Sequence, residues 1–533
     1  MKFVNVLFVV LLYCTHLSAQ VTLPNNLYFT HIGVEDGLCQ NTVCCILQDH
    51  LGFIWLGTKD GLTRYDGYRF RVFKHDAADP MSIGNNFIRV LYEDADGLIW
   101  IGTNVGVYIY NPETENFRKF DVATERGDVI SREVSSIKCD SSGDLWIGVN
   151  WQGVFRYDRR DESLELYEPV PGDTTSLSSV HVWDLCFDGD GNLWVGSQNG
   201  GLDRYDRETD RFVRHRLKGL SDVSRIVLDK QNQLLLGTMK DGLFSFNPYM
   251  GTCQPLLLDS GHKDLFVRAI FVRNSREVVV GTENGIYIYD CVTRKTRHVN
   301  QELGNPYSLS CKAVYSIYCD KEGALWIGTY FGGVNYLPPS SSLIFDKFYP
   351  IGHSDRLSGK AVREFVRDES GIIWIGTEDQ GLNRFDPVSG KFTHYNSRNS
   401  GLSCDNVHGL CVDGDRLYIG TFFGGFNIMD LKTNEIVALG SQMLPDDSVF
   451  SIFRDHDGRI WVGLTYGLCL FHPEDGSFEL VREIPENLFI YDIYQGDDGI
   501  IYFAAYNRGV ITYNPHTGTV SYTQLTLPTI LRV

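Results

Sequence analysis

DGLIWIGTNVGVYIYN, from Asp96 to Asn111, contains the pattern that decides the fold. An Asp-Gly pair leads into an apolar run with one Trp, and a Gly-Thr step and a short turn separate this run from a second apolar run. Apolar runs rich in β-branched and aromatic residues, joined by glycine-containing turns, are typical of β-hairpins. The stretch alone therefore predicts two antiparallel strands.

The same pattern recurs along the chain at intervals of 41 to 48 residues. The glycine of the Trp-x-Gly-Thr step occurs ten times, and an eleventh copy has Ala504 in its place. The ten are Gly57, Gly102, Gly148, Gly196, Gly237, Gly281, Gly328, Gly376, Gly420 and Gly463. A period in the forties, built from strands and turns without helical periodicity, indicates the four-stranded blades of a β-propeller.

Each repeat predicts four strands, A to D. In the eighth repeat they are expected at 361–368, 372–377, 382–386 and 391–396. The Trp before the recurrent glycine should pack between neighbouring blades rather than bind a ligand. The Asp-x-Asp-Gly turns between strands A and B resemble the start of a calcium loop, but they lack its downstream ligands, so a structural role is favoured.

Two segments that resemble strand D stand outside the repeats. Tyr28–Ile32 precedes the first repeat, and a similar run follows the linker Pro338–Ser342. Pairing of Tyr28–Ile32 with Gly333–Leu337 would seal a ring and leave no open strand edge. The prediction is an all-β chain, with a seven-bladed β-propeller at 20–339 and four blades of an incomplete second β-propeller at 340–522. Residues 523–533 match no part of the repeat and resemble a non-native tail.

The N-terminus predicts export. Residues 1–19 have Lys2, an apolar core and small residues before Gln20, which is typical of a secretory signal peptide cleaved after Ala19. The expected location is the periplasm. The lipoprotein alternative through Cys14 is disfavoured, because bulky Tyr13 precedes it.

The charge and the cysteines limit the partners and the chemistry. The formal net charge is −19, with no basic run, which argues against binding to nucleic acid or to an anionic membrane. Twelve cysteines follow Cys14, and several occupy equivalent apolar positions of different repeats. Equivalent positions cannot meet in pairs, so we expect mostly free, buried thiols. Cys44 and Cys45 should face opposite sides of one strand.

Three segments carry a resemblance to a known family. Phe29–Gly67, Leu325–Leu337 and Ile372–Asp386 resemble the two-component regulator propellers, and the similarity extends over about residues 25–520. The resemblance implies the periplasmic sensor region of a Bacteroides-type hybrid two-component system histidine kinase. It implies an oligosaccharide ligand that controls polysaccharide-utilisation genes, and a membrane helix and kinase in the full-length protein. The chain stops in the eleventh repeat, so we expect a C-terminally truncated fragment without catalysis of its own.

Candidate ligand-binding residues lie in the turns between strands B and C. Sugars stack on aromatic rings and hydrogen-bond to neighbouring amides and carboxylates. The aromatic candidates are Trp151, Tyr330, Phe331, Phe422, Phe423, Tyr466 and Tyr506, and the polar ones are Asn150, Gln152, Gln198, Glu378, Asp379 and Asn507. The alternative is that these rings cap the blades. We expect the oligosaccharide near the junction of the two propellers, on Tyr330, Phe331, Phe422 and Phe423, with Glu378 and Asp379 nearby.

No catalytic, metal or cofactor motif is recognised, and none of the three is predicted. Two other classes of function remain open. One is a secreted β-propeller enzyme, either a lyase or a glycan-active enzyme, and the other is a protein-interaction scaffold. A second propeller after the linker favours the sensor over a single-ring lyase. A homodimer is also considered.

Overall fold

The computed structural model describes residues 22–217, 220, 222–257, 265–339, 347–349, 356–439, 444–485 and 487–523. The predicted signal peptide, residues 340–342 of the predicted linker and residues 524–533 of the predicted tail lie outside the described residues. The chain forms two compact units, unit 1 (residues 1–346) and unit 2 (residues 347–533). No helix in the described part of the chain is long and apolar enough to cross a membrane.

The described residues form eleven four-stranded antiparallel sheets, numbered here in chain order. A short 3-10 helix, η1 (Val34–Asp36), precedes sheet 1. Sheets 1 to 3 contain β2 (Val43–Gln48), β3 (Ile54–Thr58), β4 (Gly61–Tyr65) and β5 (Phe70–Phe73); β6 (Ile88–Glu93), β7 (Ile99–Thr103), β8 (Gly106–Asn111) and β9 (Asn116–Lys119); β10 (Val134–Cys139), β11 (Leu145–Val149), β12 (Gly153–Asp158) and β13 (Ser163–Tyr167). Sheets 4 and 5 contain β14 (Val182–Phe187), β15 (Leu193–Ser197), β16 (Gly201–Asp206) and β17 (Arg211–His215); β18 (Arg225–Leu228), β19 (Leu234–Gly237), β20 (Leu243–Asn247) and β21 (Thr252–Leu257). Sheets 6 and 7 contain β22 (Val267–Val272), β23 (Glu277–Thr282), β24 (Gly285–Asp290) and β25 (Thr296–Val299); β26 (Val314–Cys319), β27 (Leu325–Thr329), β28 (Val334–Leu337) and β1 (Thr30–Ile32).

Unit 2 holds sheets 8 to 11. They contain β29 (Val362–Arg367), β30 (Ile373–Thr377), β31 (Leu382–Asp386) and β32 (Lys391–Tyr395); β33 (Val407–Asp413), β34 (Arg416–Thr421), β35 (Gly425–Asp430) and β36 (Ile436–Leu439); β37 (Val449–Arg454), β38 (Ile460–Leu464), β39 (Gly467–His472) and β40 (Ser477–Leu480); β41 (Ile490–Gln495), β42 (Ile501–Ala505), β43 (Gly509–Asn514) and β44 (Thr519–Thr523). The strands predicted for the eighth repeat differ from β29–β32 by one residue at most at either end. The all-β propeller fold predicted from the repeat is confirmed.

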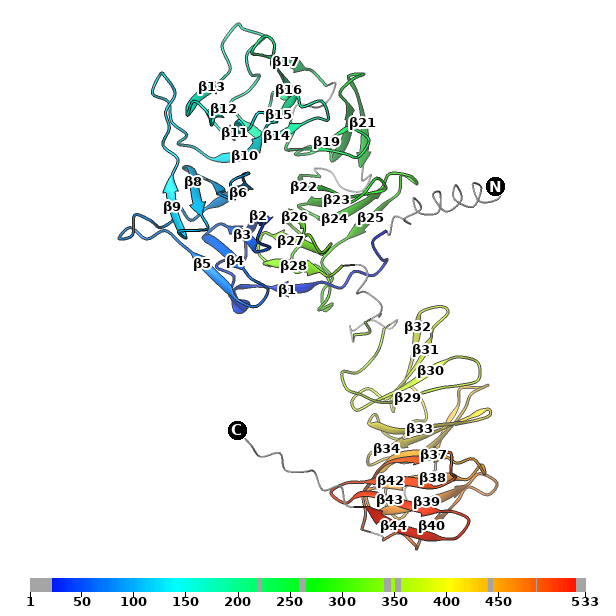
Figure 1. Cartoon of the computed structure of the whole chain (residues 1–533). Coiled ribbons are helices and arrows are strands. Elements are labelled where there is room, and N and C mark those ends of the chain that lie inside the picture. The colour runs from blue at the N-terminus through cyan, green and yellow to red at the C-terminus, as the bar shows by residue number, and fades with distance from the viewer. Residues whose placement is uncertain are drawn as a thin grey trace, which may run out of the picture. The chain divides into compact units, whose positions relative to one another are not determined.

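Unit 1 is a ring of sheets around a common centre (Figure 1). The first strand of each sheet contacts the first strand of the next, and β26 of sheet 7 contacts β2 of sheet 1. The ring closes where the N-terminal strand β1 pairs with β28, with Thr30 opposite Tyr336 and Ile32 opposite Val334. The predicted closure is confirmed, although β1 begins two residues later than the segment predicted for it.

The recurrent position is a glycine because the next sheet packs too closely to leave room for a Cβ atom. A Cβ built on Gly102 would lie 2.6 Å from Cγ1 of Val134 in the next sheet, and one on Gly376 would lie 2.7 Å from Cγ1 of Val407. Both distances are far below van der Waals contact, so only glycine fits. One interblade contact therefore imposes the same residue on sheet after sheet.

The Trp and Asp of the repeat form a second recurrent contact. Trp100 is 2% exposed, and its Nε1 donates a hydrogen bond of 2.8 Å to Oδ2 of Asp94, while Oδ1 of Asp94 accepts from the backbone of Asp96 and Leu98. The same Trp–Asp bond recurs at Trp55, Trp146, Trp194, Trp326, Trp374 and Trp461. The structural role predicted for the first Asp of these turns is confirmed, because it holds the turn and the indole together.

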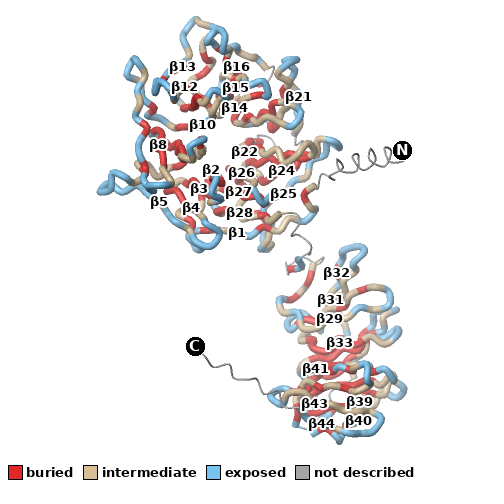
Figure 2. Tube along the Cα trace, viewed as in Figure 1, coloured by how far each residue is buried: buried red, intermediate tan, exposed pale blue. Residues whose placement is uncertain are grey.

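Within the described part of unit 2, another sheet packs on only one face of the first sheet. The first residue of strand A is 0% exposed at Val134 and Val407, but 47% exposed at Val362, and Phe365 is 70% exposed. No glycine of a preceding sheet packs on Val362 within the described part of unit 2. The second strands β3, β7 and β11 are buried throughout, whereas exposed residues lie mainly in the turns and in fourth strands such as β5 and β9 (Figure 2).

All twelve cysteines after Cys14 are free thiols, as predicted. Their predicted burial is wrong for ten of them, which are only partly buried, and Cys411 and Cys469 alone are buried. The predicted alternation of Cys44 and Cys45 is interrupted, because a β-bulge separates Val43 from Cys45.

Candidate ligand-binding surfaces

The predicted aromatic residues lie at one end of the sheets, called here the loop end, which carries the B–C turns and the D–A connections. Two of them have an unusual backbone. Trp151 has a φ of 70° and Phe423 a φ of 65°, in the left-handed region that bulky residues avoid. Trp151 is 65% exposed and Phe423 is 69% exposed. A strained backbone that displays an aromatic ring to solvent is characteristic of binding sites.

Each of the two pairs of adjacent aromatic residues has one side chain that packs inward and one that is exposed. Tyr330 is half-buried, its ring centroid lies 5.0 Å from that of Tyr315, and its hydroxyl accepts a 3.0 Å hydrogen bond from Nζ of Lys59. Phe331 follows it and is 69% exposed. Phe422 and Phe423 repeat this arrangement, with ring centroids 3.9 Å apart. The packing alternative therefore fits Tyr330 and Phe422, and the outer rings stay free to stack on a ligand.

The remaining aromatic candidates differ in how many ring contacts they make. Trp151 contacts the His181 ring edge-on at 4.1 Å, and Asn150 Oδ1 lies 3.3 Å from Nδ1 of His181. Tyr506 is 60% exposed and lies 5.6 Å from Phe489. Tyr466 is 66% exposed and makes no ring contact with another described aromatic residue.

The polar candidates are partly committed to other contacts. Glu378 forms an ion pair of 3.4 Å with Arg363, and its side chain is 43% exposed. Asp379 accepts a 3.2 Å hydrogen bond from the backbone of Lys360. Gln152 is held by its own loop, since Oε1 accepts from Ser131 and Nε2 donates to the carbonyl of Val129. The predicted site at the junction of the two units stays a prediction.

A second set of residues was missed by the sequence analysis. In ten of the described sheets the A–B register shifts after the first residue of strand A, which leaves the second residue without a cross-strand partner. Such a bulge re-aims a side chain. The bulged residues are Cys44, Arg89, Ser135, Trp183, Arg268 and Tyr315 in unit 1, and Arg363, His408, Phe450 and Tyr491 in unit 2.

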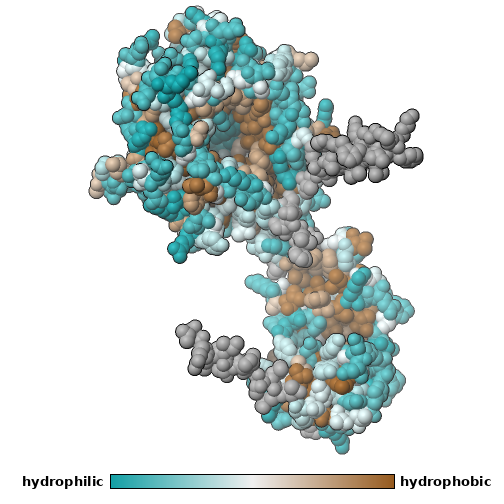
Figure 3. Space-filling model, in the orientation of Figure 1, coloured by the Kyte–Doolittle hydropathy of each residue, from teal (hydrophilic) through white to brown (hydrophobic). Residues whose placement is uncertain are grey.

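In unit 1 the bulged residues converge at the loop end of the ring's centre, called here the central mouth. The ring of Trp183 in sheet 4 lies 6.3 Å from the ring of Phe266 next to sheet 6. Sheet 5 lies between these two sheets, so their side chains can meet only near the centre of the ring. Arg268 lies 3.8 Å from the Phe266 ring and 4.7 Å from Tyr315. In the space-filling view unit 1 is hollowed at its centre, with hydrophobic residues on part of the wall (Figure 3).

In unit 2 the equivalent residues also meet. Arg363 donates a 2.8 Å hydrogen bond to the hydroxyl of Tyr491, and its guanidinium lies 3.3 Å from Nδ1 of His408. His408 lies 4.3 Å from Phe450, which in turn contacts Phe422 at 5.4 Å. Burial and the neighbouring charge of Arg363 lower the pKa of His408 to about 4, so the imidazole is neutral at pH 7.

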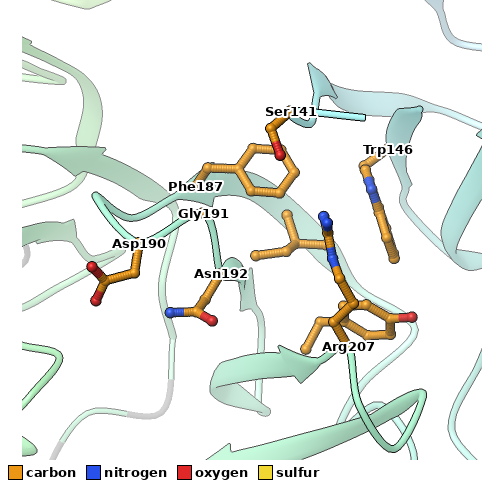
Figure 4. Close-up of a pocket in the computed structure, with 9 residues that line it drawn as sticks. Ser141, Trp146, Phe187, Asp190, Gly191, Asn192 and Arg207 are labelled. Carbon is orange, nitrogen blue, oxygen red and sulfur yellow. The ribbon is translucent and has the colours of Figure 1, made fainter. Parts of the chain in front are cut away.

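A hollow of about 140 Å³ lies at the opposite end of unit 1, between sheets 3 and 4. Figure 4 shows the Arg207 side chain in this hollow, with Trp146 and Phe187 on either side. Arg207 forms a 2.9 Å ion pair with Asp140, and Arg159 forms a related 3.3 Å pair with Asp94 one sheet earlier. The hollow therefore belongs to the packing of neighbouring sheets, and none of the predicted site residues line it.

Comparisons with known proteins agree with the repeat. The two-component regulator propeller family model matches residues 37–60, 82–105, 176–199, 308–331 and 443–466. Each match runs from the D–A connection through strands A and B to the B–C turn of one sheet. A curated relative, histidine kinase P4 of Formosa agariphila, is 39% identical over 59 residues, which are 11% of this chain and 4% of that protein.

Solved structures with the same fold include the extracellular domains of two putative hybrid two-component systems from B. thetaiotaomicron. For BT3049 the TM-score is 0.61 and the identity 23%, covering 93% of this chain and 78% of that one. For BT4673 the TM-score is 0.52 and the identity 19%, covering 94% and 74%. These likenesses establish the fold. The five stretches that the family model matches are similar to two-component regulator propeller repeats.

Proposed function

We propose that the chain is the periplasmic ligand-sensing region of a hybrid two-component system sensor histidine kinase. Its ligand is an oligosaccharide from glycan breakdown, and binding controls polysaccharide-utilisation genes. The region itself performs no catalysis. The kinase, a membrane-anchoring helix and a homodimer belong to the proposal for the whole protein. The family matches, the histidine kinase relative and the extracellular location of the two similar solved domains support this assignment.

The observation that carries ligand binding is the display of strained aromatic rings at the loop end. Placing Trp151 and Phe423 in the left-handed region costs about 1–2 kcal/mol each. Both rings are more than 60% exposed, so burial of their apolar surface offsets little of this cost. Aromatic faces beside amides and carboxylates suit the apolar faces and hydroxyls of sugars. The loop end is therefore the proposed binding surface.

Calorimetry of the purified chain against a panel of glycan fragments tests the proposal. Trp151→Ala, Phe331→Ala and Phe423→Ala, made singly, should each leave folding intact, and at least one should weaken binding about five- to thirty-fold. Tyr68→Ala is the matched control, because Tyr68 is 93% exposed in a C–D turn at the other end of sheet 1.

Two outcomes would contradict the proposal. If no fragment in a broad panel binds, oligosaccharide sensing is wrong. If a fragment binds equally well to the wild type and to all three variants, the loop-end surface is wrong. Chromatography of the fragments before and after incubation separates a sensor from an enzyme, because a lyase or hydrolase would convert its ligand into products.

A further inference from the structure

The central mouth of unit 1 gathers cations in a chain whose net charge is −19. Burial raises the pKa of the Cys44 thiol to about 11, and the nearby charges of Arg89, Lys59, Arg268 and Arg225 act against this rise. Four cations from sheets 1, 2, 5 and 6 therefore surround one bulged residue at the centre of the ring. Four cations grouped around one point of a strongly acidic protein form a candidate site for an anion.

Arg225 differs from Arg89 and Arg268 because no described carboxylate is paired with it. Its Nε donates a 2.7 Å hydrogen bond to the carbonyl of Arg268, and its Nη1 donates a 2.8 Å bond to the carbonyl of Ser224. It forms no ion pair with any described residue. Of its five N–H groups these bonds use two. Burial lowers the pKa of Arg225 while the charge of Asp184 opposes this, yet a guanidinium stays charged at neutral pH.

The neighbouring cations are arranged on aromatic faces. Arg89 lies 4.2 Å from the ring of Phe87, Arg268 lies 3.8 Å from that of Phe266, and Lys59 lies 4.1 Å from that of Tyr330. Arg89 also pairs with Glu133 at 3.1 Å, and Arg268 with Glu283 at 2.5 Å. The two outer arginines are thus held in place by carboxylates.

A second unsatisfied donor lies at the same mouth. The indole Nε1 of Trp183 is buried and has no hydrogen-bond partner in the described part of the chain. A buried donor without an acceptor costs about 1–3 kcal/mol. A ligand with several acceptor oxygens could accept hydrogen bonds both from this indole and from the N–H groups of Arg225 that have no partner among the described residues.

We propose that the central mouth of unit 1 is an anion site that receives a carboxylate or sulfate group of an acidic oligosaccharide. Arg225 supplies a guanidinium that the charge of Asp184 acts on but that forms no ion pair with a described residue. Arg89 and Arg268 lie beside it, and Trp183 donates an additional hydrogen bond. Arginine forks match carboxylate and sulfate oxygens, and the ring faces around them suit the sugar. This inference rests on the proposed function and narrows its ligand to an acidic glycan.

The test uses two pairs of probes that differ in charge alone. The first pair is trigalacturonic acid and its full methyl ester, and the second is a dextran sulfate oligomer and the matching dextran. Calorimetry of the purified chain should show that at least one acid binds about ten-fold or more tightly than its neutral partner, with affinity falling as salt rises. The acid that binds more tightly shows whether the site prefers a carboxylate or a sulfate group.

Three variants locate the site. Arg225→Gln and Arg268→Gln should each weaken binding of the acid about ten-fold and leave the neutral partner unchanged, and Trp183→Phe should weaken it less. Arg160→Gln is the charge-matched control, since Arg160 lies in a C–D turn at the other end of sheet 3 with its side chain 71% exposed. Thermal unfolding checks that each variant is folded. If Arg225→Gln does not fold, Arg268→Gln and Trp183→Phe still test the site.

The inference is overturned if neither acid binds more tightly than its neutral partner, or if the folded variants bind the acid as the wild type does. Its failure is distinguishable from that of the proposed function. Neutral fragments that bind the loop end and respond to Trp151→Ala or Phe331→Ala would keep the sensor and remove the anion site.

Discussion

Asp203 occupies a buried position where three other sheets have an asparagine. It lies on β16 opposite Val195, as Asn335, Asn383 and Asn427 lie on their third strands, and all four are 0% exposed. Each uses a side-chain oxygen to accept a hydrogen bond from the backbone of the preceding D–A connection, and in Asp203 this is a 2.9 Å bond from Ser178 to Oδ2. Oδ1 of Asp203 has no partner among the described residues.

Burial raises the pKa of Asp203 from 3.8 to about 6, against the hydrogen bonds from Ser178 and the charge of Arg214. Because the folded pKa lies above the unfolded one, folding favours the protonated form. Its contribution is fully present below pH 3.8 and is lost as the pH rises through about 6. A shift of this size corresponds to about 3 kcal/mol of lost stability at pH 8 and about half of that at pH 5.

Asp203→Asn should therefore stabilise unit 1 by up to about 3 kcal/mol at pH 8 and clearly less at pH 5. Its Nδ2 would donate where Oδ1 now lacks a partner, as Nδ2 of Asn335 donates to Oγ of Ser310 at 2.8 Å. Urea unfolding followed by tryptophan fluorescence measures this, because only Trp374 and Trp461 of the nine tryptophans lie in unit 2.

The reciprocal variant Asn335→Asp is the control, and it should destabilise unit 1 with the same dependence on pH. The reasoning is refuted if Asp203→Asn changes the free energy of unfolding equally at pH 5 and pH 8. It is also refuted if the substitution destabilises unit 1 at pH 8.

Four further results are expected. Gly102→Ala should destabilise unit 1 by about 1–3 kcal/mol in urea unfolding, because its Cβ would lie 2.5 Å from Val90, and an unchanged midpoint would contradict the packing argument. Trp151→Asn should raise stability by about 1 kcal/mol in the same assay, since Asn tolerates a positive φ, while weakening ligand binding. The pKa of His408 falls from 6.5 to about 4 on folding, so its contribution is present above pH 6.5 and is lost as the pH falls toward 4; His408→Asn should flatten this dependence in unit 2, and a parallel pH profile would argue against it. A thiol reagent added to the unfolded, unreduced chain should label all twelve cysteines after Cys14, and a count of ten or fewer would reveal at least one disulfide.

The fold could be predicted from the sequence because each sheet meets the next through the same atoms. Gly102 has to accommodate Val134, and Gly376 has to accommodate Val407 in the same way. A contact that repeats in space leaves a repeat in the sequence, so the period, the strands and the closing strand β1 can all be recognised from the amino-acid pattern.

The aromatic turns were only partly predictable. The sequence shows Tyr330 next to Phe331, but the backbone of the turn decides which ring packs inward and which is exposed. Tyr330 is fixed by Lys59 and Tyr315, which come from two different sheets. Side chains from separate sheets meet only in the closed ring, so a local pattern cannot separate a capping ring from a displayed one.

The central mouth was missed for a related reason. The residue after the first valine or isoleucine of strand A varies from copy to copy, as in the Arg of Ile88-Arg89-Val90 and the Trp of Val182-Trp183-Asp184. Regular strand alternation places that residue against a neighbouring sheet, where an arginine would be costly. The bulge changes its direction instead, and the ring then brings Trp183 and Phe266 together across an intervening sheet. A position that varies within an otherwise uniform repeat is under no interblade constraint, which leaves it free to serve a ligand. Variation at this one position of the repeat is therefore the sequence signal that distinguishes Arg89, Trp183 and Arg268 from the residues that hold the blades together.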